Sequence, residues 1–541
     1  MTLLNVQNLN LSIGKTPILK DISFDLEAGR ILGIVGESGS GKSITALSIL
    51  QLLPNGTKWD GDISFDGQDI KALSEDDFCD LRGNDISMIF QEPMTALNPV
   101  KTIGDQVSES IRIHTGKSRA EADQLARETL NRVELPESEF PLSRYPHDLS
   151  GGQRQRVMIA MAIALQPKLL IADEPTTALD VTTQAEILDL LQKLVKEDGL
   201  SLMLITHDLA VVAQMADDVL VMKDGEIVEQ GSSFDVFSNM HHPYTRQLFS
   251  ASNHVPNRSA TEQDQDQDDV VLSVEHVSCD YRLPKKLLFS KQQYFRAVKD
   301  VSFKIHRGEN IGLVGGSGCG KSTLSRAILA LKSLDEGDVR INGKTFSSKG
   351  KGPEISQRAA TQIVFQDPYS SFNPRHKVGR LITEPFYTKT EQLSDEEMQL
   401  AVKEALESVG LKAADSDKYI HEFSGGQRQR IAIARALIVK PSLIVLDEAV
   451  SALDVSIRAQ VLDLLAELSD RYNLSYLFIS HDLSVVRSIT DRVLVMERGK
   501  IVETGPTQDV FENPQHAYTK SLIKAIPKLD IDEIRAKEHM T

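Results

Sequence analysis

The two halves of this 541-residue chain begin with the same alternation of apolar and polar residues. The alternation covers residues 4–13, 22–29 and 31–36, and again residues 271–281, 301–308 and 311–316. A period of two places the apolar side chains on one face of an extended segment, so we expect six β-strands here. Later runs that are almost wholly apolar predict buried parallel strands. They lie at residues 169–173, 200–208, 443–447 and 474–482.

Helical patterns separate these strands. A helix is expected directly after the third strand of each half, at residues 44–53 and 323–332. Two charged segments, residues 118–133 and 394–410, carry apolar residues at a spacing of three to four and begin with a serine that can cap a helix. Strands that alternate with helices predict an α/β core, here with a β-rich edge and a helical insertion.

Five short motifs occur in both halves, in the same order. The first copy reads GESGSGKS from Gly36, FQEP from Phe90, LSGGQ from Leu149, LLIADEP from Leu169 and ITHD from Ile205. The second reads GGSGCGKS from Gly315, FQDP from Phe365, FSGGQ from Phe423, LIVLDEA from Leu443 and ISHD from Ile479. The offset between the copies changes only from 321 − 42 = 279 at the lysines to 481 − 207 = 274 at the histidines. The chain is therefore predicted to contain a duplicated domain.

The length of the chain suits two domains of about 250 residues each. Residues 252–270 contain four aspartates and almost no large apolar side chains, a composition that buries too little surface to fold. We expect a first domain at residues 1–251, a disordered acidic linker at residues 252–270 and a second domain at residues 271–541.

Charge and composition narrow the classes of function. The formal net charge is −17 at pH 7 with acidic and basic residues mixed along the chain, which argues against a nucleic-acid-binding surface. No apolar run approaches the roughly 20 residues that span a bilayer. The first residues have no basic start followed by an apolar core, so no secretory signal is expected. Three cysteines without paired spacing fit a reducing cytosol.

The glycine-rich motif after the third strand has the pattern G-x-x-x-x-G-K-[ST], whose backbone N–H groups curl around a phosphate chain. Its lysine is expected to reach the β- and γ-phosphates of a nucleotide, and the serine after it to bind Mg²⁺. In the first half the predicted ATP-binding residues are Gly36, Glu37, Ser38, Gly39, Ser40, Gly41, Lys42, Ser43 and Ile44. In the second half they are Gly315, Gly316, Ser317, Gly318, Cys319, Gly320, Lys321, Ser322 and Thr323.

A buried strand ends in two adjacent acidic residues in each half. The first of the two, Asp173 or Asp447, is placed to hold Mg²⁺. The second, Glu174 or Glu448, can position or deprotonate an attacking water molecule. A histidine follows the next strand in the sequence [ST]-H-D and is expected to contact the γ-phosphate. The predicted catalytic residues are Glu174, His207, Glu448 and His481.

Taken together, these motifs resemble the nucleotide-binding domains of ABC ATPases, and the resemblance covers almost all of both halves. It implies two tandem P-loop ATPase domains, each with a RecA-like core, an antiparallel β subdomain and a helical subdomain. It also implies that Gln91 and Gln366 contact both Mg²⁺ and the nucleotide. The S-G-G of the signature LSGGQ or FSGGQ begins a helix whose free N–H groups face a phosphate.

In ABC ATPases two domains pair head-to-tail, and each ATP lies between one P-loop and the opposing signature. The resemblance thus implies that Lys42 shares a site with Ser424, Gly425, Gly426 and Gln427. Lys321 shares the other site with Ser150, Gly151, Gly152 and Gln153. One polypeptide then supplies both halves of both sites, which gives the duplication a reason.

The halves differ where ABC ATPases usually carry an aromatic ring that stacks on adenine. Tyr281 has this place in the second half, whereas the alignment puts Ile13 in the first. Pro175 after the first acidic pair has become Ala449 after the second. Neither change removes a catalytic group, so we expect both sites to hydrolyse ATP.

Two further pairs of segments resemble the oligopeptide, dipeptide and nickel importer branch of this family. They are FQEPMTALNP from Phe90 with FQDPYSSFNP from Phe365, and the tails HHPYTRQLF from His241 and PQHAYTKSLI from Pro514. A chain with both ATPase halves resembles peptide and microcin C uptake ATPases of the Yej type, or fused glutathione-importer ATPases. The resemblance implies a peripheral ATPase on the cytoplasmic face of a bacterial inner membrane. Its partners are then two integral-membrane permease subunits and, indirectly, an extracytoplasmic substrate-binding protein, with no nucleic acid.

Alternatives stay open from the sequence alone. Glutathione or nickel could replace peptides as the substrate. An exporter ATPase shares the core motifs without the tail, and an ABC-F type translation factor has a longer helical linker. Residues 282–296 mix basic, apolar and aromatic side chains, and form either a surface hairpin or a contact with lipid headgroups or a permease.

Overall fold

A computed structural model describes the chain except for short segments. The described residues are 1–177, 179–258, 269–283, 285, 291–389, 393–451, 453–527 and 529. They divide into two compact units, which consist chiefly of Met1–Leu179 with Thr183–Asn253 and of His254–Ile526. We call these the first and the second unit.

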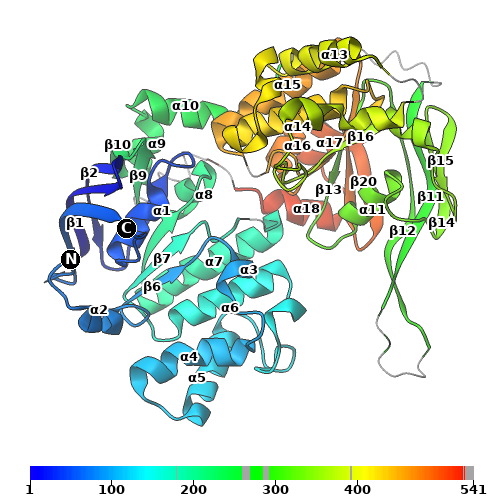
Figure 1. Cartoon of the computed structure of the whole chain (residues 1–541). Coiled ribbons are helices and arrows are strands. Elements are labelled where there is room, and N and C mark those ends of the chain that lie inside the picture. The colour runs from blue at the N-terminus through cyan, green and yellow to red at the C-terminus, as the bar shows by residue number, and fades with distance from the viewer. Residues whose placement is uncertain are drawn as a thin grey trace. The chain divides into compact units, whose positions relative to one another are not determined.

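The first unit contains two sheets (Figure 1). An antiparallel sheet has the order β2-β1-β4-β5, formed by β1 (Thr2–Ile13), β2 (Thr16–Glu27), β4 (Thr57–Phe65) and β5 (Gln68–Asp69). A six-stranded sheet has the order β10-β9-β3-β8-β7-β6. Its strands are β3 (Ile31–Val35), β6 (Ile86–Ile89), β7 (Leu169–Asp173), β8 (Ser201–Ile205), β9 (Asp218–Lys223) and β10 (Glu226–Ser232). All but β10 pair in parallel, as the apolar runs predict.

Helices of the first unit follow its strands and fill an insertion between β6 and β7. They are α1 (Lys42–Ile49), α2 (Glu75–Leu81), α3 (Pro93–Ala96), α4 (Ile103–Thr115), α5 (Arg119–Arg132), α6 (Gly151–Ile163), α7 (Val181–Asp198), α8 (Leu209–Met215), α9 (Ser233–Asn239) and α10 (Pro243–Ser252), with a 3-10 turn η1 (Pro146–Asp148). In Figure 1, α4 and α5 lie beyond α6, on the side away from β1 and β2. They form the predicted helical insertion.

The second unit repeats both sheets strand for strand. The antiparallel sheet, in the order β12-β11-β14-β15, contains β11 (Val270–Arg282), β12 (Tyr294–His306), β14 (Glu336–Ile341) and β15 (Lys344–Ser348). The larger sheet, in the order β16-β17-β18-β13-β19-β20, contains β13 (Asn310–Val314), β16 (Thr361–Val364), β17 (Leu443–Asp447), β18 (Ser475–Ile479), β19 (Arg492–Glu497) and β20 (Lys500–Pro506). The equal strand orders are the structural form of the sequence duplication.

The helices of the second unit are α11 (Lys321–Ile328), α12 (Val378–Thr383), α13 (Asp395–Ser408), α14 (Gly425–Leu437), α15 (Val455–Tyr472), α16 (Leu483–Ile489), α17 (Thr507–Glu512) and α18 (Ala517–Lys524). Short 3-10 turns complete it: η2 (Ile355–Ala360), η3 (Glu384–Thr388), η4 (Ala413–Asp417) and η5 (Ile420–Glu422). Where the first unit has the continuous α4, the second has the shorter α12 followed by η3.

Local signals account for several of these boundaries. Ser118 and Ser394 cap α5 and α13, each in a capping box with a glutamate three residues on, as predicted. The central strands β3, β7 and β8 are buried along their whole length, because helices pack on one face of the sheet and the antiparallel sheet with α1 packs on the other. The helices expected at residues 44–53 and 323–332 are shorter: α1 ends at Ile49 and α11 at Ile328, just before residues with positive φ.

The prediction of a disordered linker from residue 252 is wrong at its first edge. Ser252 is the last residue of α10, and the guanidinium of Arg258 binds Asp491 (3.0 Å) and the carbonyl of Ile489 (3.1 Å). His254 Nε2 also lies 2.6 Å from Asp463, and these polar contacts supply the order that apolar burial does not. Residues 259–268 of the predicted linker lie outside the described residues.

The segment 282–296 is described only in part. Its described ends pair with each other: the N–H of Leu283 donates to the carbonyl of Gln293 (2.9 Å), and β11 and β12 continue the pairing inward. The described ends of the segment are therefore paired strands, and the two alternatives for its role stay open. Residues 284 and 286–290 lie outside the described residues.

Candidate functional site

Each P-loop connects a buried central strand to the helix that begins at its lysine. The ammonium group of Lys42 donates to the carbonyls of Gly36 (2.8 Å) and Glu37 (3.0 Å). Lys321 does the same with the carbonyls of Gly315 (2.6 Å) and Gly316 (3.0 Å). Both lysines are buried although they carry charge, which is tolerated because the loop's own carbonyls surround the ammonium group. The sites at the two lysines are therefore built alike.

One glycine of each loop has no room for a side chain. A Cβ on Gly36 would lie 2.3 Å from the carbonyl oxygen of Met222, and one on Gly315 would lie 2.2 Å from that of Met496. Because the loop runs so close to β9 or β19, only glycine fits at its first position. The loop is thus fixed against the sheet at one side.

The other predicted P-loop residues follow the same pattern in the two units. Ser38 with Gly39, and Ser317 with Gly318, are exposed at the tip of the loop. Ser40 and its counterpart Cys319 are buried beneath it. Gly41 and Gly320 have left-handed backbone and directly precede α1 and α11. In the first turn of these helices Ser43 and Ser322 are exposed, and Ile44 and Thr323 beside them are partly buried.

The aspartate at the end of β7 fits the role of a metal ligand. Asp173 is 5% exposed and hydrogen-bonds with Ser43, while its Oδ1 has no hydrogen-bond partner among the described residues. Burial, together with the charge of Glu174, raises the pKa of Asp173, although Ser43 and Lys42 lower it. A buried carboxylate oxygen without a donor, beside a serine hydroxyl, is the kind of ligand set that Mg²⁺ prefers.

In the second unit the corresponding aspartate has different neighbours. Asp447 hydrogen-bonds with Ser325 rather than with the predicted ligand Ser322, and Arg326 adds a nearby positive charge. Burial raises the pKa of Asp447, as does the charge of Glu448, and Arg326 with the P-loop lysine opposes this. The two predicted metal sites are therefore similar in their carboxylates and unequal in their surroundings.

Glu174 has left-handed backbone (φ 47°), a conformation that costs free energy in a residue other than glycine. Its carboxylate accepts hydrogen bonds from Gln91 Nε2 (2.9 Å) and from the hydroxyl of Thr177 (2.8 Å), and His207 Nδ1 lies 3.2 Å away. Burial alone would raise the pKa of Glu174, but His207, Thr177 and Lys42 lower it to about 2. This carboxylate is ionised throughout the neutral range.

Glu448 repeats the backbone conformation (φ 52°) with fewer partners. His481 Nδ1 lies 3.3 Å from its carboxylate, and no other side chain among the described residues is in hydrogen-bond contact with that carboxylate. Burial opposes ionisation, yet His481 and Lys321 lower the pKa of Glu448. Burial would lower the pKa of His481, but the hydrogen bond and charge of Glu448 raise it above its ordinary value.

The two predicted glutamines, Gln91 and Gln366, also differ in their contacts with the acidic pair of their unit. Gln91 lies just after β6 and donates to Glu174, so the structure joins these two predicted site residues. Gln366 lies just after β16 and is exposed, as Gln91 is. Among the described residues, a glutamine side chain contacts the acidic pair in the first unit only.

Each signature begins a helix, at α6 and at α14. Ser150 accepts the N–H of Gln153 (3.3 Å), whose side chain accepts the N–H of Ser150 (2.9 Å). Ser424 and Gln427 form the same capping box (3.4 and 3.1 Å). Each side chain accepts the backbone N–H of the other residue, and the two glycines lie between these residues at the start of the helix.

The two glycines of each signature serve different purposes. A Cβ on Gly152 would lie 2.3 Å from Thr183 Cγ2, and one on Gly426 would lie 2.5 Å from Ile457 Cγ2, so these glycines allow two helices to pack closely. At Gly425 a Cβ would meet nothing within 4 Å, and at Gly151 it would make an ordinary contact of 3.6 Å. Packing within the unit therefore does not explain the first glycine, which supports a role in binding.

The difference predicted between Tyr281 and Ile13 has a clear place in the fold. Ile13 is the last residue of β1 and Tyr281 the last but one of β11, and the side chains of Tyr281 and Ile13 are 39% and 36% exposed. The hydroxyl of Tyr281 is 3.4 Å from that of Thr323 in the first turn of α11, and Lys332 lies over its ring (4.4 Å). Tyr281 thus presents an aromatic face beside the P-loop helix, whereas Ile13 offers a smaller apolar surface.

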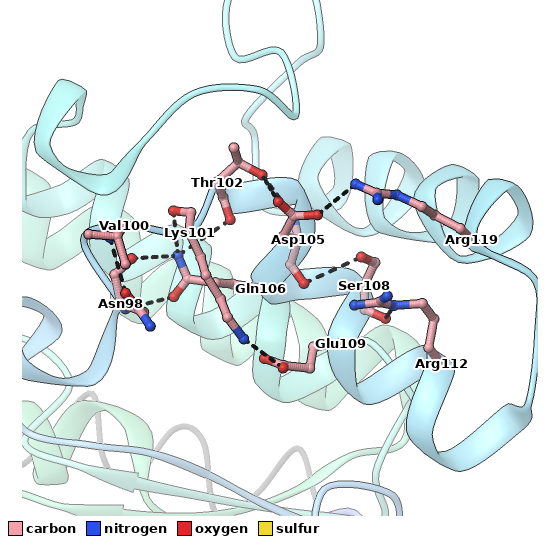
Figure 2. Close-up of polar contacts among 10 residues, drawn as sticks. All are labelled: Asn98, Val100, Lys101, Thr102, Asp105, Gln106, Ser108, Glu109, Arg112 and Arg119. Atoms are coloured by element: carbon pink, nitrogen blue, oxygen red, sulfur yellow. Dashed lines mark hydrogen bonds and ion pairs between the residues drawn. The ribbon is translucent and has the colours of Figure 1, made fainter.

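Polar contacts fix the segment that follows Gln91 (Figure 2). The N–H of Asn98 donates to the buried Gln106 side chain (2.8 Å), whose amide donates back to the carbonyls of Asn98 and Lys101 (3.1 Å each). The Asn98 side chain accepts the N–H of Val100 (3.0 Å), and Val100 itself is 80% exposed. A rigid turn thus presents an apolar side chain to its surroundings. None of the helices in the described part of the chain is both long and apolar enough to cross a membrane.

Sequence comparisons agree with this architecture. The pattern of the ABC transporter family matches residues 19–177 and 298–451, which include both P-loops and both acidic pairs. The chain belongs to the ABC transporter ATP-binding family. It is therefore an ATPase with two tandem ABC domains, and the predicted fold is confirmed. The pattern "Oligopeptide/dipeptide transporter, C-terminal region" also matches twice, at residues 228–282 and 502–539.

Relatives of the ABC chain resemble it over almost its whole length. One is the peptidoglycan transport ATP-binding protein YejF of Agrobacterium fabrum, 46% identical over 99% of this chain and 98% of the relative. Another is the glutathione import ATP-binding protein GsiA of Escherichia coli K12, 45% identical over 97% of this chain and 89% of the relative. Among solved structures, cbiO1 of Clostridium perfringens is 26% identical, covers 50% of this chain and 99% of its own, and has a TM-score of 0.41.

Some residues at the sites were not predicted from the sequence. Thr177 donates to Glu174, and Ser325 with Arg326 accompanies Asp447. Tyr244 and Tyr518 contact the P-loops from the tails. The two tyrosines had a signal, since the tail sequence recurs in both halves, but its period does not reveal a contact with a distant loop.

Proposed function

We propose that this chain drives the uptake of short peptides through separate permease subunits. The observation that carries this proposal is the double match to the oligopeptide/dipeptide transporter C-terminal region, at residues 228–282 and 502–539. The relatives named for peptidoglycan and glutathione transport support it, because both compounds contain amino acids in amide linkage. Glutathione itself is the second candidate, favoured by the 45% identity to GsiA.

The proposed ATP sites each use a P-loop lysine and the backbone around it. Mg²⁺, when bound, would supply positive charge that stabilises the phosphates. Asp173 and Ser43 would hold it in one site, and Asp447 with Ser322 in the other. The unpartnered oxygen of Asp173 supports the first set, and Gln91 or Gln366 would complete the contacts.

We propose Glu174 and Glu448 as the groups that orient the attacking water. Their lowered pKa values keep both carboxylates ionised at neutral pH, so each can accept a hydrogen bond from water. His207 and His481, which lie against these carboxylates, would hold them toward the γ-phosphate. A carboxylate with three donors is a weak base, so Glu174 becomes more basic when Gln91 or Thr177 releases it.

The signature of each unit is proposed to complete the ATP site of the other. This head-to-tail pairing rests on the family resemblance and on the first signature glycine, whose side chain position is open within its own unit. An arginine at Ser424 should then impair the site of Lys42 and spare that of Lys321. Nucleotide trapping at each site measures this, and damage confined to the site of Lys321 would reverse the pairing.

The permeases are proposed to contact the surface beside the segments that follow Gln91 and Gln366. In the first unit this surface carries exposed Phe90 and Val100, and in the second Phe365, Tyr369 and Tyr387. Aromatic and apolar side chains on a rigid segment are typical of protein contact sites. The chain would then act at the cytoplasmic face of the inner membrane.

The experiment that tests the function is purification of the chain from its native membranes in mild detergent, followed by mass spectrometry of its partners. Two permeases with several membrane spans and an extracytoplasmic binding protein are expected. Reconstituted transport of a tripeptide, of glutathione and of Ni²⁺ then separates the substrates. Ribosomal proteins without permeases, or uptake of Ni²⁺ alone, would overturn the peptide assignment.

A further inference from the structure

The tail that marks the peptide-importer branch reaches back to the P-loop in both units. Tyr244, in the first turn of α10, accepts the N–H of Glu37 on its hydroxyl (3.1 Å). Tyr518, in the first turn of α18, accepts the N–H of Gly316 in the same way (2.7 Å). These pairs are 207 and 202 positions apart in the sequence. Two copies of one long-range contact indicate a retained design rather than an accident of packing.

The residue that the tyrosine holds is also the residue that holds the P-loop lysine. Glu37 donates its N–H to Tyr244 and accepts the ammonium group of Lys42 on its carbonyl (3.0 Å). Gly316 connects Tyr518 to Lys321 in the same manner (3.0 Å). One residue therefore separates the tail hydroxyl from the cation that is proposed to bind the phosphates. A change in the position of the tyrosine alters the carbonyl that orients the lysine.

Polar contacts fix the first tyrosine and the residues beside it. The N–H of Tyr244 donates to Nδ1 of His242, which caps α10. Glu229 on β10 accepts the N–H groups of His241 (2.7 Å) and His242 (3.2 Å) with its carboxylate, and the hydroxyl of Thr245 as well. Tyr244 is 4% exposed, so its ring is also held by packing.

The second unit repeats this support. The N–H of Tyr518 donates to Nδ1 of His516 (3.2 Å), and Glu503 on β20 accepts the N–H groups of Gln515 (2.7 Å) and His516 (3.0 Å). Burial would raise the pKa of Glu503, but these N–H groups lower it, so the cap carries a full negative charge at neutral pH. A series of contacts thus connects an edge strand to each P-loop. It runs from the glutamate on the strand, through the histidine that caps the helix, to the tyrosine that contacts the loop.

We propose that Tyr244 and Tyr518 are positioning residues for the P-loop lysines, and that they make nucleotide affinity depend on the C-terminal region of each unit. The hydroxyl fixes the start of a loop whose tip, at Ser38 and Ser317, is exposed. A ligand or subunit that displaced α10 or α18 would therefore weaken ATP binding. This inference rests on the proposed ATP sites and extends them to a part of the chain outside the motifs.

The test is the double variant Tyr244→Phe with Tyr518→Phe in the full chain, which keeps both rings and removes both acceptors. We expect the Kd and the KM for ATP to rise about three- to tenfold, the range that loss of one such hydrogen bond gives. The kcat at saturating ATP should stay within about twofold of the wild-type value. The melting temperature without nucleotide should stay close to that of the wild type, because the packing of the rings is kept. Such a split between KM and kcat is not expected of a residue that only supports the fold.

Two further variants sharpen the test. Glu229→Gln with Glu503→Gln weakens the support of the helix caps and leaves the tyrosines in place. This variant should also raise the Kd for ATP, by a smaller factor than the double phenylalanine variant. Tyr476→Phe is the matched control. Its buried hydroxyl has no hydrogen-bond partner among the described residues, so its loss should leave the Kd for ATP unchanged.

The inference is overturned if the double phenylalanine variant binds ATP with the wild-type Kd, or if its kcat and melting temperature fall while the Kd stays the same. A Lys42→Ala, Lys321→Ala variant separates this failure from that of the ATP sites. If the lysine variant binds MgATP as well as the wild type, the proposed sites themselves are wrong. If the lysine variant loses MgATP while the phenylalanine variant binds it normally, only the role of the tyrosines fails.

Discussion

The two units place the same carboxylate after the same strand and then surround it differently. The carboxylate of Glu174 is held by Gln91, Thr177 and His207, whereas among the described residues only His481 is in hydrogen-bond contact with the carboxylate of Glu448. The residue three positions after each glutamate shows how small a change suffices. Thr177 turns its hydroxyl to the carboxylate of Glu174, while Ser451 donates to the backbone carbonyl of Glu448 (2.9 Å). Duplication has thus preserved the proposed catalytic carboxylate more strictly than its surroundings.

The nucleotide-binding side shows an opposite imbalance. The second unit presents Tyr281 beside its P-loop helix, and the first presents Ile13 at the same place. The first unit therefore has the more constrained glutamate, and the second the better surface for a purine base. From this comparison we expect two sites that both turn over and that differ in affinity and in pH response.

The largest effect is expected from removing both carboxylates. Glu174→Gln with Glu448→Gln should lower the rate of phosphate release by at least about 100-fold, since a positioned base contributes about 10²–10⁴. ATP should remain bound, because the amide keeps the shape of the side chain and the P-loops are untouched. Single variants then report each site by itself. Rapid hydrolysis by the double variant would show that neither carboxylate has the proposed role.

Exchange of the stacking residue tests the affinity difference. Tyr281→Ile should weaken ATP binding at the second site by about 5- to 100-fold, given about 1–3 kcal/mol for stacking of an aromatic ring on a base. Ile13→Tyr should strengthen binding at the first site. Site-resolved titration with ATP measures both, with Tyr294→Ile, an exposed residue of β12, as the matched control. Equal affinities in all variants would contradict stacking at this position.

Much of this comparison could be read from sequence, because the motifs are local. The parallel strands, the signature serines at helix starts and the acidic pairs all follow from short patterns, and the structure has them where they are expected. The contacts around Glu174 could not be predicted. Gln91 is 83 positions away from it, and whether a hydroxyl such as that of Thr177 turns to a side chain or to the backbone depends on tertiary packing.

The same distinction explains the errors. Composition predicts disorder for residues 252–270, but it does not register the long-range contacts of Arg258 with Asp491, 233 positions later, and of His254 with Asp463. The apolar periodicity predicts a longer α1, because the apolar residues continue beyond the point where left-handed backbone at Gln51 ends the helix. Tyr244 belongs to a recognisable tail, yet its contact with the P-loop closes a loop of 207 residues. Long-range polar contacts are the part that local patterns omit.

Hydroxyl removal tests whether the two loops after the glutamates really differ. Thr177→Val should lower the free energy of unfolding by about 1.5–3 kcal/mol, the range for a hydrogen bond to a charged acceptor. Ser451→Ala, the matched change in the second unit, should cost about 0.5–1.5 kcal/mol, because it removes only a bond to a neutral carbonyl. Urea unfolding of both variants provides the comparison. A larger cost for Ser451→Ala would mean that the carboxylate contact of Thr177 contributes little.

The smallest effect is a pH dependence that should be clearer in the second unit. Glu448 raises the pKa of His481, so the folded state binds this proton more tightly than the unfolded chain does. The resulting stability is fully present below the ordinary histidine pKa of about 6.5 and is lost as pH rises through the raised value. His481→Gln should therefore lower the unfolding midpoint more at pH 6 than at pH 9.

The first unit provides the contrast for this last measurement. Gln91 and Thr177 continue to hold Glu174 when His207 is replaced, whereas Glu448 loses the one side-chain contact that the described residues give it. The change of midpoint between pH 6 and pH 9 should thus be larger for His481→Gln than for His207→Gln, at about 2–4 °C for each kcal/mol in domains of this size. Equal changes in the two variants would mean that the extra donors around Glu174 do not stabilise its negative charge. The surroundings of the two glutamates would then be equivalent in solution despite their different contacts.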